Sequence, residues 1–170
     1  MVLMLTALLL LLMAAPPDAF SPHGEKAVVL LFIRSDCPIS NRYAPAIEQL
    51  YAKYSSAGVD FRLIYSEAGL TAAAMEHHRE EYGYKIPGEI DAGHRYVKRA
   101  GVRATPEAAV FVGGQLVYRG RIDDRFVDFG KIRSEAAHHD LEEVLAGIVA
   151  GKIPRYRETQ AIGCAIENLQ

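Results

Sequence analysis

Cys37 is the residue of this sequence whose position most clearly suggests chemistry. It lies between Arg34-Ser-Asp and Pro38-Ile-Ser40, and proline is favoured at the first helical position because its missing N–H would be unpaired there anyway. Cys37 is therefore expected at the N-cap of a helix, where free backbone amides and the positive end of the helix dipole face its sulfur. Because these groups stabilise a thiolate and lower the thiol pKa, Cys37 is a candidate nucleophile.

Ser40, one helical turn after Cys37, is the second candidate in this segment. Its hydroxyl can donate a hydrogen bond to the thiolate and so help to keep the pKa low. It can also cap backbone amides, a role that serine fills often. Nearby, Arg34 favours the thiolate and Asp36 opposes it. An inert, buried cysteine in a strand-to-helix turn is the alternative for the whole segment.

Two elements must position Cys37. The seven uninterrupted apolar residues Ala27–Ile33 are rich in β-branched types and too short for a buried helix, so they predict a central strand covered on both faces. After Pro38, apolar residues recur at helical spacing. These residues are Tyr43, Ile47, Leu50, Tyr51 and Tyr54.

A distant segment completes a recognisable pair of loops. Val102-Arg-Ala-Thr105-Pro106 precedes an apolar run that begins at Ala108. With Cys37-Pro-Ile-Ser and the proline at position 45, it resembles the thioredoxin-like superfamily, in which an active-site loop opens a proline-bent helix and a cis-proline loop enters a strand. The Asp-Cys-Pro-X-Ser-Asn form, with Thr-Pro-Glu-Ala and a late Gly-Cys, looks like the redoxin branch (alkyl hydroperoxide reductase/thiol-specific antioxidant type) of exported bacterial proteins.

The resemblance implies an α/β fold: a thioredoxin-like three-layer sandwich with a central mixed β-sheet and an inserted helical segment. It covers about residues 27–151. It also implies that Pro38, Thr105 and Pro106 bind substrate, because a cis Thr105-Pro106 bond places the backbone of Thr105 beside the sulfur, where an extended substrate can pair with it.

The sequence departs from the thioredoxin pattern in ways that bear on mechanism. Ser40 occupies the position of the second cysteine, so this loop cannot resolve its own mixed disulfide. Leu31 stands where thioredoxins carry a buried acid, and Asp36 stands where they carry tryptophan. Glu107, directly after the proline, is the nearest replacement for the acid and can exchange protons during catalysis if desolvation raises its pKa. A solvated glutamate at the start of a strand is the alternative.

Cys164 is the second of two cysteines and lies in the small apolar segment Ala161-Ile-Gly-Cys-Ala-Ile. We expect it to reach Cys37, because a free exposed thiol is unusual in an exported protein and Cys37 is the one other cysteine. It can act there as a resolving cysteine or as a structural staple. A bond to another molecule is the third alternative.

The other elements follow from periodicity and turn signals. A strand is expected over Val59–Tyr65, an inserted helix within residues 70–84, and a short helix from Asp91, as N-cap, through Arg99. Gly113-Gly114 predicts a hairpin between strands at residues 108–112 and 116–122. A last helix carries Leu141, Val144, Leu145 and Ile148.

Composition bounds the organisation and the location of the protein. The chain has 170 residues, half of them apolar, and a net charge of −2, which suit one globular domain and exclude a basic surface for nucleic acid.

Residues 1–19 are expected to be a signal peptide or export segment, because the apolar run over residues 2–15 is short for a membrane span. A linker (20–26), a thioredoxin-like domain (27–151) and a C-terminal tail (152–170) follow. The expected location is periplasmic or extracellular, with no stable membrane insertion after processing, or tethered to the membrane if the segment stays uncleaved.

Six histidines include the pairs His77-His78 and His138-His139. Adjacent residues on a helix point about 100° apart, so neither pair makes a bidentate site. We expect surface or helix-capping histidines and no metal site.

Three functions remain open at this stage. The leading one is thiol–disulfide exchange through Cys37, with a protein thiol or disulfide or a small thiol reductant as partner and no cofactor. The alternative is a peroxiredoxin-like peroxidase, in which Cys37 attacks a peroxide and the sulfenic acid condenses with Cys164; against it, Arg34 stands where peroxiredoxins carry threonine. The third is a non-enzymatic copper-binding or partner-binding module, since thiolates suit Cu(I), although the second loop cysteine is missing.

Overall fold

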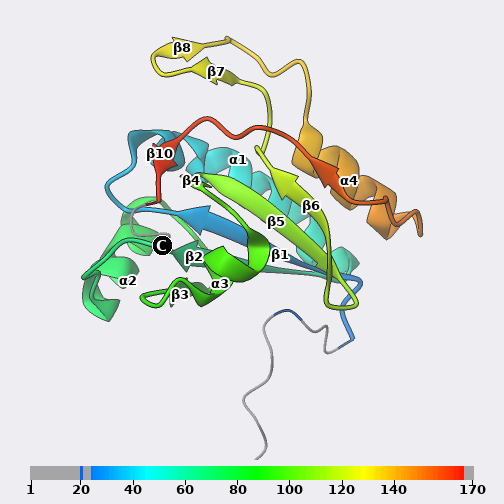
Figure 1. The fold of residues 1–170 in the computed structure, drawn as a ribbon, viewed down its shortest axis with the longest axis horizontal. Helices are drawn as coiled ribbons and strands as arrows, with labels where there is room; N and C mark the ends of the chain where they lie inside the picture. Colours follow the sequence, from blue (N-terminus) through cyan, green and yellow to red (C-terminus); the bar gives the residue numbers. More distant parts are fainter. Residues whose placement is uncertain (1–19, 21–23, 167–170) are drawn as a thin grey trace, which may run out of the picture.

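The computed structural model describes residue 20 and residues 24–166. The expected export segment, residues 1–19, lies outside the described residues. A six-stranded sheet runs through the molecule in the order β3-β2-β1-β5-β6-β9 (Figure 1). Its strands are β1 (Ala27–Ile33), β2 (Val59–Tyr65), β3 (Gly88–Ile90), β5 (Glu107–Val112), β6 (Gln115–Gly120) and β9 (Arg157–Glu158).

The predicted strand over Ala27–Ile33 is an interior strand of this sheet. All seven residues of β1 are buried, as the uninterrupted apolar run requires. β1 pairs in parallel with β2 and antiparallel with β5, so the sheet is mixed. The carboxyl end of β1 therefore delivers the chain to Cys37 from the centre of the sheet.

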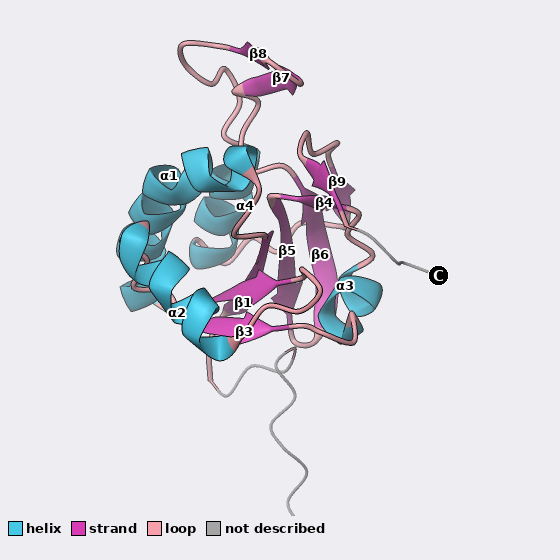
Figure 2. Cartoon of the chain, turned by 90° about the vertical axis from the view of Figure 1, so that its left-hand side faces the viewer, coloured by secondary structure: helices cyan, strands magenta, loops and turns pink. Residues whose placement is uncertain are grey.

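Helices cover both faces of the sheet (Figure 2). They are α1 (Pro38–Tyr54), α2 (Ala72–Glu81), α3 (Arg95–Ala100) and α4 (Asp140–Val149), with a short 3₁₀ helix, η1 (Ser55–Ala57). Alternate residues of β1 enter two separate cores: Val29 and Leu31 pack with α1 and α4, whereas Leu30 packs with α3. The predicted three-layer α/β architecture is confirmed.

The expected start of the second short helix is wrong by a few residues. α3 begins at Arg95 rather than just after Asp91, because residues 91–94 form a turn with His94 in the left-handed region. The Asp91 carboxylate still serves the helix, since it accepts hydrogen bonds from the backbone N–H groups of Arg95 (2.7 Å) and Val97 (3.0 Å). The N-cap residue is therefore His94 and not Asp91 as predicted, although the Asp91 side chain still accepts hydrogen bonds from two N–H groups at the start of the helix.

Four short pairings were not predicted, among them the parallel pairing of β3 with β2 at one edge of the sheet. The hairpin of β7 (Phe126–Asp128) and β8 (Lys131–Ile132) extends from the body of the molecule (Figure 1). β9 adds the tail to the sheet beside β6, and β10 (Cys164–Ala165) pairs with β4 (Ala104–Thr105). In the described part of the chain, no helix has the length and apolar character needed to span a membrane.

Asp140 holds the start of the C-terminal tail (152–170) against the body of the protein. Its side chain is almost fully buried at the first turn of α4 and pairs with Arg121 (2.6 Å) and with Arg157 of β9. These ion pairs join α4, the loop after β6 and the start of the tail.

We expect Asp140→Ala to lower the free energy of unfolding by about 2–3 kcal/mol, less than for a fully buried pair because both guanidinium groups are partly exposed. Urea denaturation measures this change. Glu143→Ala is the matched control, since Glu143 pairs with the same Arg157 but is half exposed, and it should cost less than about 1 kcal/mol. Equal losses in the two variants would contradict the anchoring role.

Candidate active site

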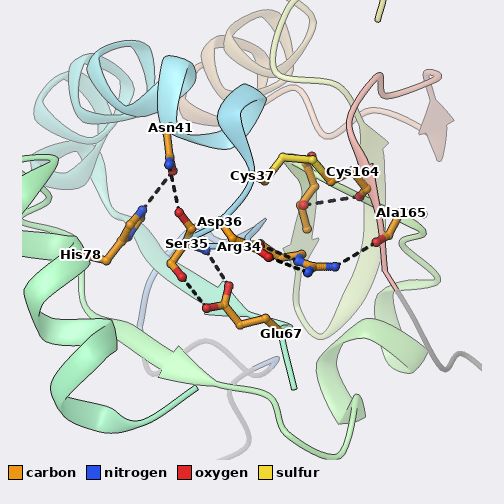
Figure 3. Close-up of a disulfide and its surroundings, with 10 residues drawn as sticks. Arg34, Ser35, Asp36, Cys37, Asn41, Glu67, His78, Cys164 and Ala165 are labelled. Carbon is orange, nitrogen blue, oxygen red and sulfur yellow. Dashed lines mark hydrogen bonds and ion pairs between the residues drawn. A yellow bond between two sulfur atoms is a disulfide. The ribbon is translucent and has the colours of Figure 1, made fainter. Parts of the chain in front are cut away.

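Cys37 is the N-cap residue of α1, and Pro38 is the first residue of that helix. The Cys37 side chain is fully buried and forms a disulfide with Cys164, 127 residues later, with 6.1 Å between the Cα atoms (Figure 3). The expected pairing of the two cysteines within one chain is therefore confirmed.

The tail reaches Cys37 by pairing with the loop before Pro106. Cys164 lies opposite Thr105 in the antiparallel β4–β10 pair, and the N–H of Ile166 donates to the carbonyl oxygen of Arg103 at 3.0 Å. The Thr105–Pro106 peptide bond is cis. The backbone that the thioredoxin resemblance assigns to an extended substrate is thus occupied by the chain's own tail.

Gly163 allows this close approach. A Cβ atom at position 163 would overlap the carbonyl group of Thr105, so a side chain cannot be added without displacing the backbone. Ile166 is buried in the core beside α3, and Arg34 donates a hydrogen bond to the Ala165 carbonyl oxygen at 3.3 Å. Main-chain pairing, one buried side chain and the disulfide together hold the tail.

The surroundings of the sulfur are mostly backbone. Cys37 Sγ lies 3.2 Å from the carbonyl oxygen of Thr105, which has no proton to accept while the disulfide is intact. Ser40 is fully buried, and its Oγ has no hydrogen-bond partner among the described residues. Its bond to a Cys37 thiolate stays a prediction, because the thiolate exists only after reduction.

Glu107 lies at the cis-proline loop as a buried residue. Its carboxylate accepts hydrogen bonds from the N–H groups of Arg103 (2.8 Å) and Ala104 (3.2 Å) and lies 3.8 Å from Arg119 Nε. Desolvation raises the pKa of Glu107, while these two backbone hydrogen bonds and Arg119 act in the opposite direction. The contacts hold the loop that carries Thr105, and proton transfer to or from sulfur stays a prediction.

A polar network not identified from the sequence supports the opposite side of the Cys37 loop (Figure 3). The N–H and hydroxyl of Ser35 donate to Glu67, and Asn41 Nδ2 donates to the Ser35 carbonyl oxygen at 2.9 Å. His78 of α2 contacts Asn41 Oδ1 at 3.0 Å. The expectation of a surface or capping histidine is wrong for His78, which is buried on the face that α2 turns toward Tyr65. The aromatic Tyr82, one helical turn after His78 and partly buried against the core, was the available signal.

An apolar pocket of about 350 Å³ lies beside the disulfide. Its walls include Pro38 and Ile39 of α1, Phe126 and Phe129 of the β7–β8 hairpin, and Cys164. In the oxidised protein Cys164 lines this pocket and Cys37 is fully buried. Within residues 24–166 and residue 20, no group of three or more His, Cys, Asp or Glu side chains is arranged to hold a metal ion.

Comparisons with known proteins agree with this geometry. A protein-family model described as Redoxin matches residues 10–131. A Bacillus thuringiensis protein named thiol-disulfide oxidoreductase ResA is 32% identical over 81 residues, which cover 48% of this chain and 46% of the relative. The chain thus spans about half the length of that relative.

Two solved structures show the same fold. An uncharacterized conserved protein from Geobacillus kaustophilus has a TM-score of 0.73 at 24% identity, covering 84% of this chain and 77% of its own. The thioredoxin domain of a thiol-disulfide oxidoreductase from Bacteroides vulgatus has a TM-score of 0.53 at 12% identity, covering 74% and 80%. At these identities the likeness concerns the fold alone.

Proposed function

The chain belongs to the Redoxin family, and from this premise we propose that it catalyses thiol–disulfide exchange with Cys37 and Cys164 as its redox couple. The observation that carries the proposal is the disulfide between an N-cap cysteine and a tail cysteine paired with the cis-proline loop. The name of the Bacillus relative supports the same activity. The N-cap position favours a thiolate at Cys37, which makes this sulfur a good nucleophile and a good leaving group.

The proposed reaction has two displacements. In the reduced protein, the Cys37 thiolate attacks a substrate disulfide, forms a mixed disulfide and releases one substrate thiolate. Cys164, deprotonated, then attacks Cys37 Sγ, releases the second substrate thiolate and forms the intramolecular bond. Two electrons pass from the protein to the substrate, and the reverse sequence oxidises a substrate dithiol.

Ser40 and Glu107 have supporting roles in this proposal. The Ser40 hydroxyl is buried and has no hydrogen-bond partner within the described part of the chain while the disulfide is closed, and it donates a hydrogen bond to the Cys37 thiolate when the bond opens. The carboxyl of Glu107, whose pKa burial raises, serves as a proton reservoir at the loop. The substrate class is a protein thiol or disulfide or a small thiol, and the apolar run over residues 2–15 supports export to an oxidising compartment.

A redox titration tests the proposal against the structural alternative. Protein equilibrated with glutathione buffers is acid-quenched and mapped by mass spectrometry for the Cys37–Cys164 bond. A reduction potential above about −300 mV, together with catalysed exchange, is expected for an exchange enzyme. A potential below about −300 mV identifies a structural staple and contradicts the proposal.

A further inference from the structure

α2 places a buried histidine, His78, close to the redox loop, which is the segment 34–37 between β1 and α1. His78 lies between two polar side chains from other elements: its Nδ1 is 2.8 Å from the Tyr65 hydroxyl of β2, and its Nε2 is 3.0 Å from Asn41 Oδ1 of α1. Both His78 and Tyr65 are almost fully buried, whereas the neighbouring His77 is exposed. Buried polar groups that all find partners specify one arrangement of the elements that carry them.

The Ser35 carbonyl oxygen determines which atoms donate and which accept in the series of hydrogen bonds that runs through Asn41 and His78 to Tyr65. The Ser35 carbonyl oxygen can only accept, so Asn41 must present its amide N–H to it at 2.9 Å. Asn41 Oδ1 then faces His78 and accepts from the Nε2–H of the imidazole. The remaining ring nitrogen, Nδ1, accepts from the Tyr65 hydroxyl, so a neutral imidazole satisfies every partner.

The Ser35 carbonyl belongs to the turn that ends at Cys37. The same residue is held from its other side, because its N–H donates to Glu67 Oε2 at 2.5 Å and its hydroxyl donates to the same carboxylate. Ser35 lies in the turn that connects the end of β1 to the start of α1, and Cys37 is the second residue after it. The orientation of the Ser35 peptide therefore influences how the first amides of α1 face the sulfur.

We infer that His78 is a positioning residue for Cys37, acting through Asn41 and the Ser35 carbonyl to hold the thiolate at the N-terminus of α1. The inference rests on the proposed role of Cys37 as the reactive thiol. In this inference the inserted helix α2 provides the buried imidazole that holds the redox loop in place through Asn41. Loss of that imidazole frees the Asn41 side chain and loosens the turn, so the helix amides stabilise the thiolate less.

The test measures the Cys37 thiol pKa in the full chain carrying Cys164→Ser, from the ultraviolet absorbance of the thiolate as a function of pH. In this background, His78→Leu is expected to raise the thiol pKa by about 0.5–1 unit, the size of a weakened helix-terminus interaction. His78→Gln should keep the Cys37 pKa close to its value with His78 in place, because the glutamine amide N–H can replace Nε2–H as the donor to Asn41. His77→Leu, on the exposed position of the same helix, should leave the pKa unchanged.

Asn41→Ala provides a second route to the same answer, because Asn41 is only partly buried and this variant does not empty the core around His78. It should raise the Cys37 pKa as much as His78→Leu does, and combining the two should add little, since both act through one connection. An unchanged pKa in Asn41→Ala overturns the inference even if His78→Leu fails to fold. The measurement does not use exchange activity, so an inactive protein with a shifted pKa would overturn the proposed function and leave this inference standing.

Discussion

Cys37→Ser is expected to abolish catalysed thiol–disulfide exchange, because a serine hydroxyl can neither attack a disulfide sulfur at neutral pH nor form a disulfide itself. Cys164→Ser should behave differently. Its Cys37 still performs the first displacement, but without a resolving thiol the mixed disulfide between Cys37 and the substrate accumulates. The two variants therefore separate the attacking cysteine from the resolving cysteine.

Single-turnover assays with a disulfide substrate, quenched by acid and mapped by mass spectrometry, measure both effects. For Cys164→Ser we expect one equivalent of substrate bound to Cys37 as a mixed disulfide and no further turnover. Full multiple turnover by Cys164→Ser would show that Cys164 is not needed for resolution and that the observed disulfide is structural. Adducts found at Cys164 but not at Cys37 in the wild-type chain would reverse the assigned order of attack.

Gly163→Val is expected to weaken the docking of the tail against the cis-proline loop, and with it the closure of the Cys37–Cys164 disulfide. A Cβ at this position overlaps the Thr105 carbonyl group, which belongs to the backbone and cannot move aside as a flexible side chain would. Overpacking of this kind costs about 1–3 kcal/mol, which corresponds to a loss of about 5- to 150-fold in the effective concentration of Cys164 at Cys37. The equilibrium between the disulfide and glutathione should shift toward the reduced protein by that factor.

The control is Gly93→Val, because Gly93 has open space where the Cβ would go and a backbone that other residues adopt. Its disulfide equilibrium should equal that of the wild type. If Gly163→Val also leaves this equilibrium unchanged, the pairing of β10 with β4 does not determine how the cysteines meet. A loss of Cys37–Cys164 pairing with an unchanged unfolding transition in the reduced proteins would show that the tail docks separately from the core.

Much of the fold was predictable because its signals are local. The uninterrupted apolar run of β1 and the alternation in β2 follow from burial on a sheet, and the predicted limits of both strands are those observed. Gly113 and Gly114 both have positive φ, as the hairpin signal between β5 and β6 requires. The edge strands β3 and β9 escaped prediction because they are only two or three residues long and mostly polar, so their pairing depends on a neighbouring strand rather than on their own pattern.

The sequence by itself determined the Cys-Pro junction at the start of α1, the strand that leads to it and the cysteine that could meet it. Each depends on the type and spacing of adjacent residues, or on there being only one other cysteine. Only the tertiary structure decided that the tail lies along Thr105, that the Glu107 carboxylate holds the backbone of its own loop and that His78 reaches Asn41. Hydrogen bonds and close backbone contacts choose these partners, and neither a buried carboxylate nor a buried imidazole reveals its partner through periodicity. The tail and His78 meet residues 59 and 37 positions away, a separation that only the folded chain brings within hydrogen-bonding distance.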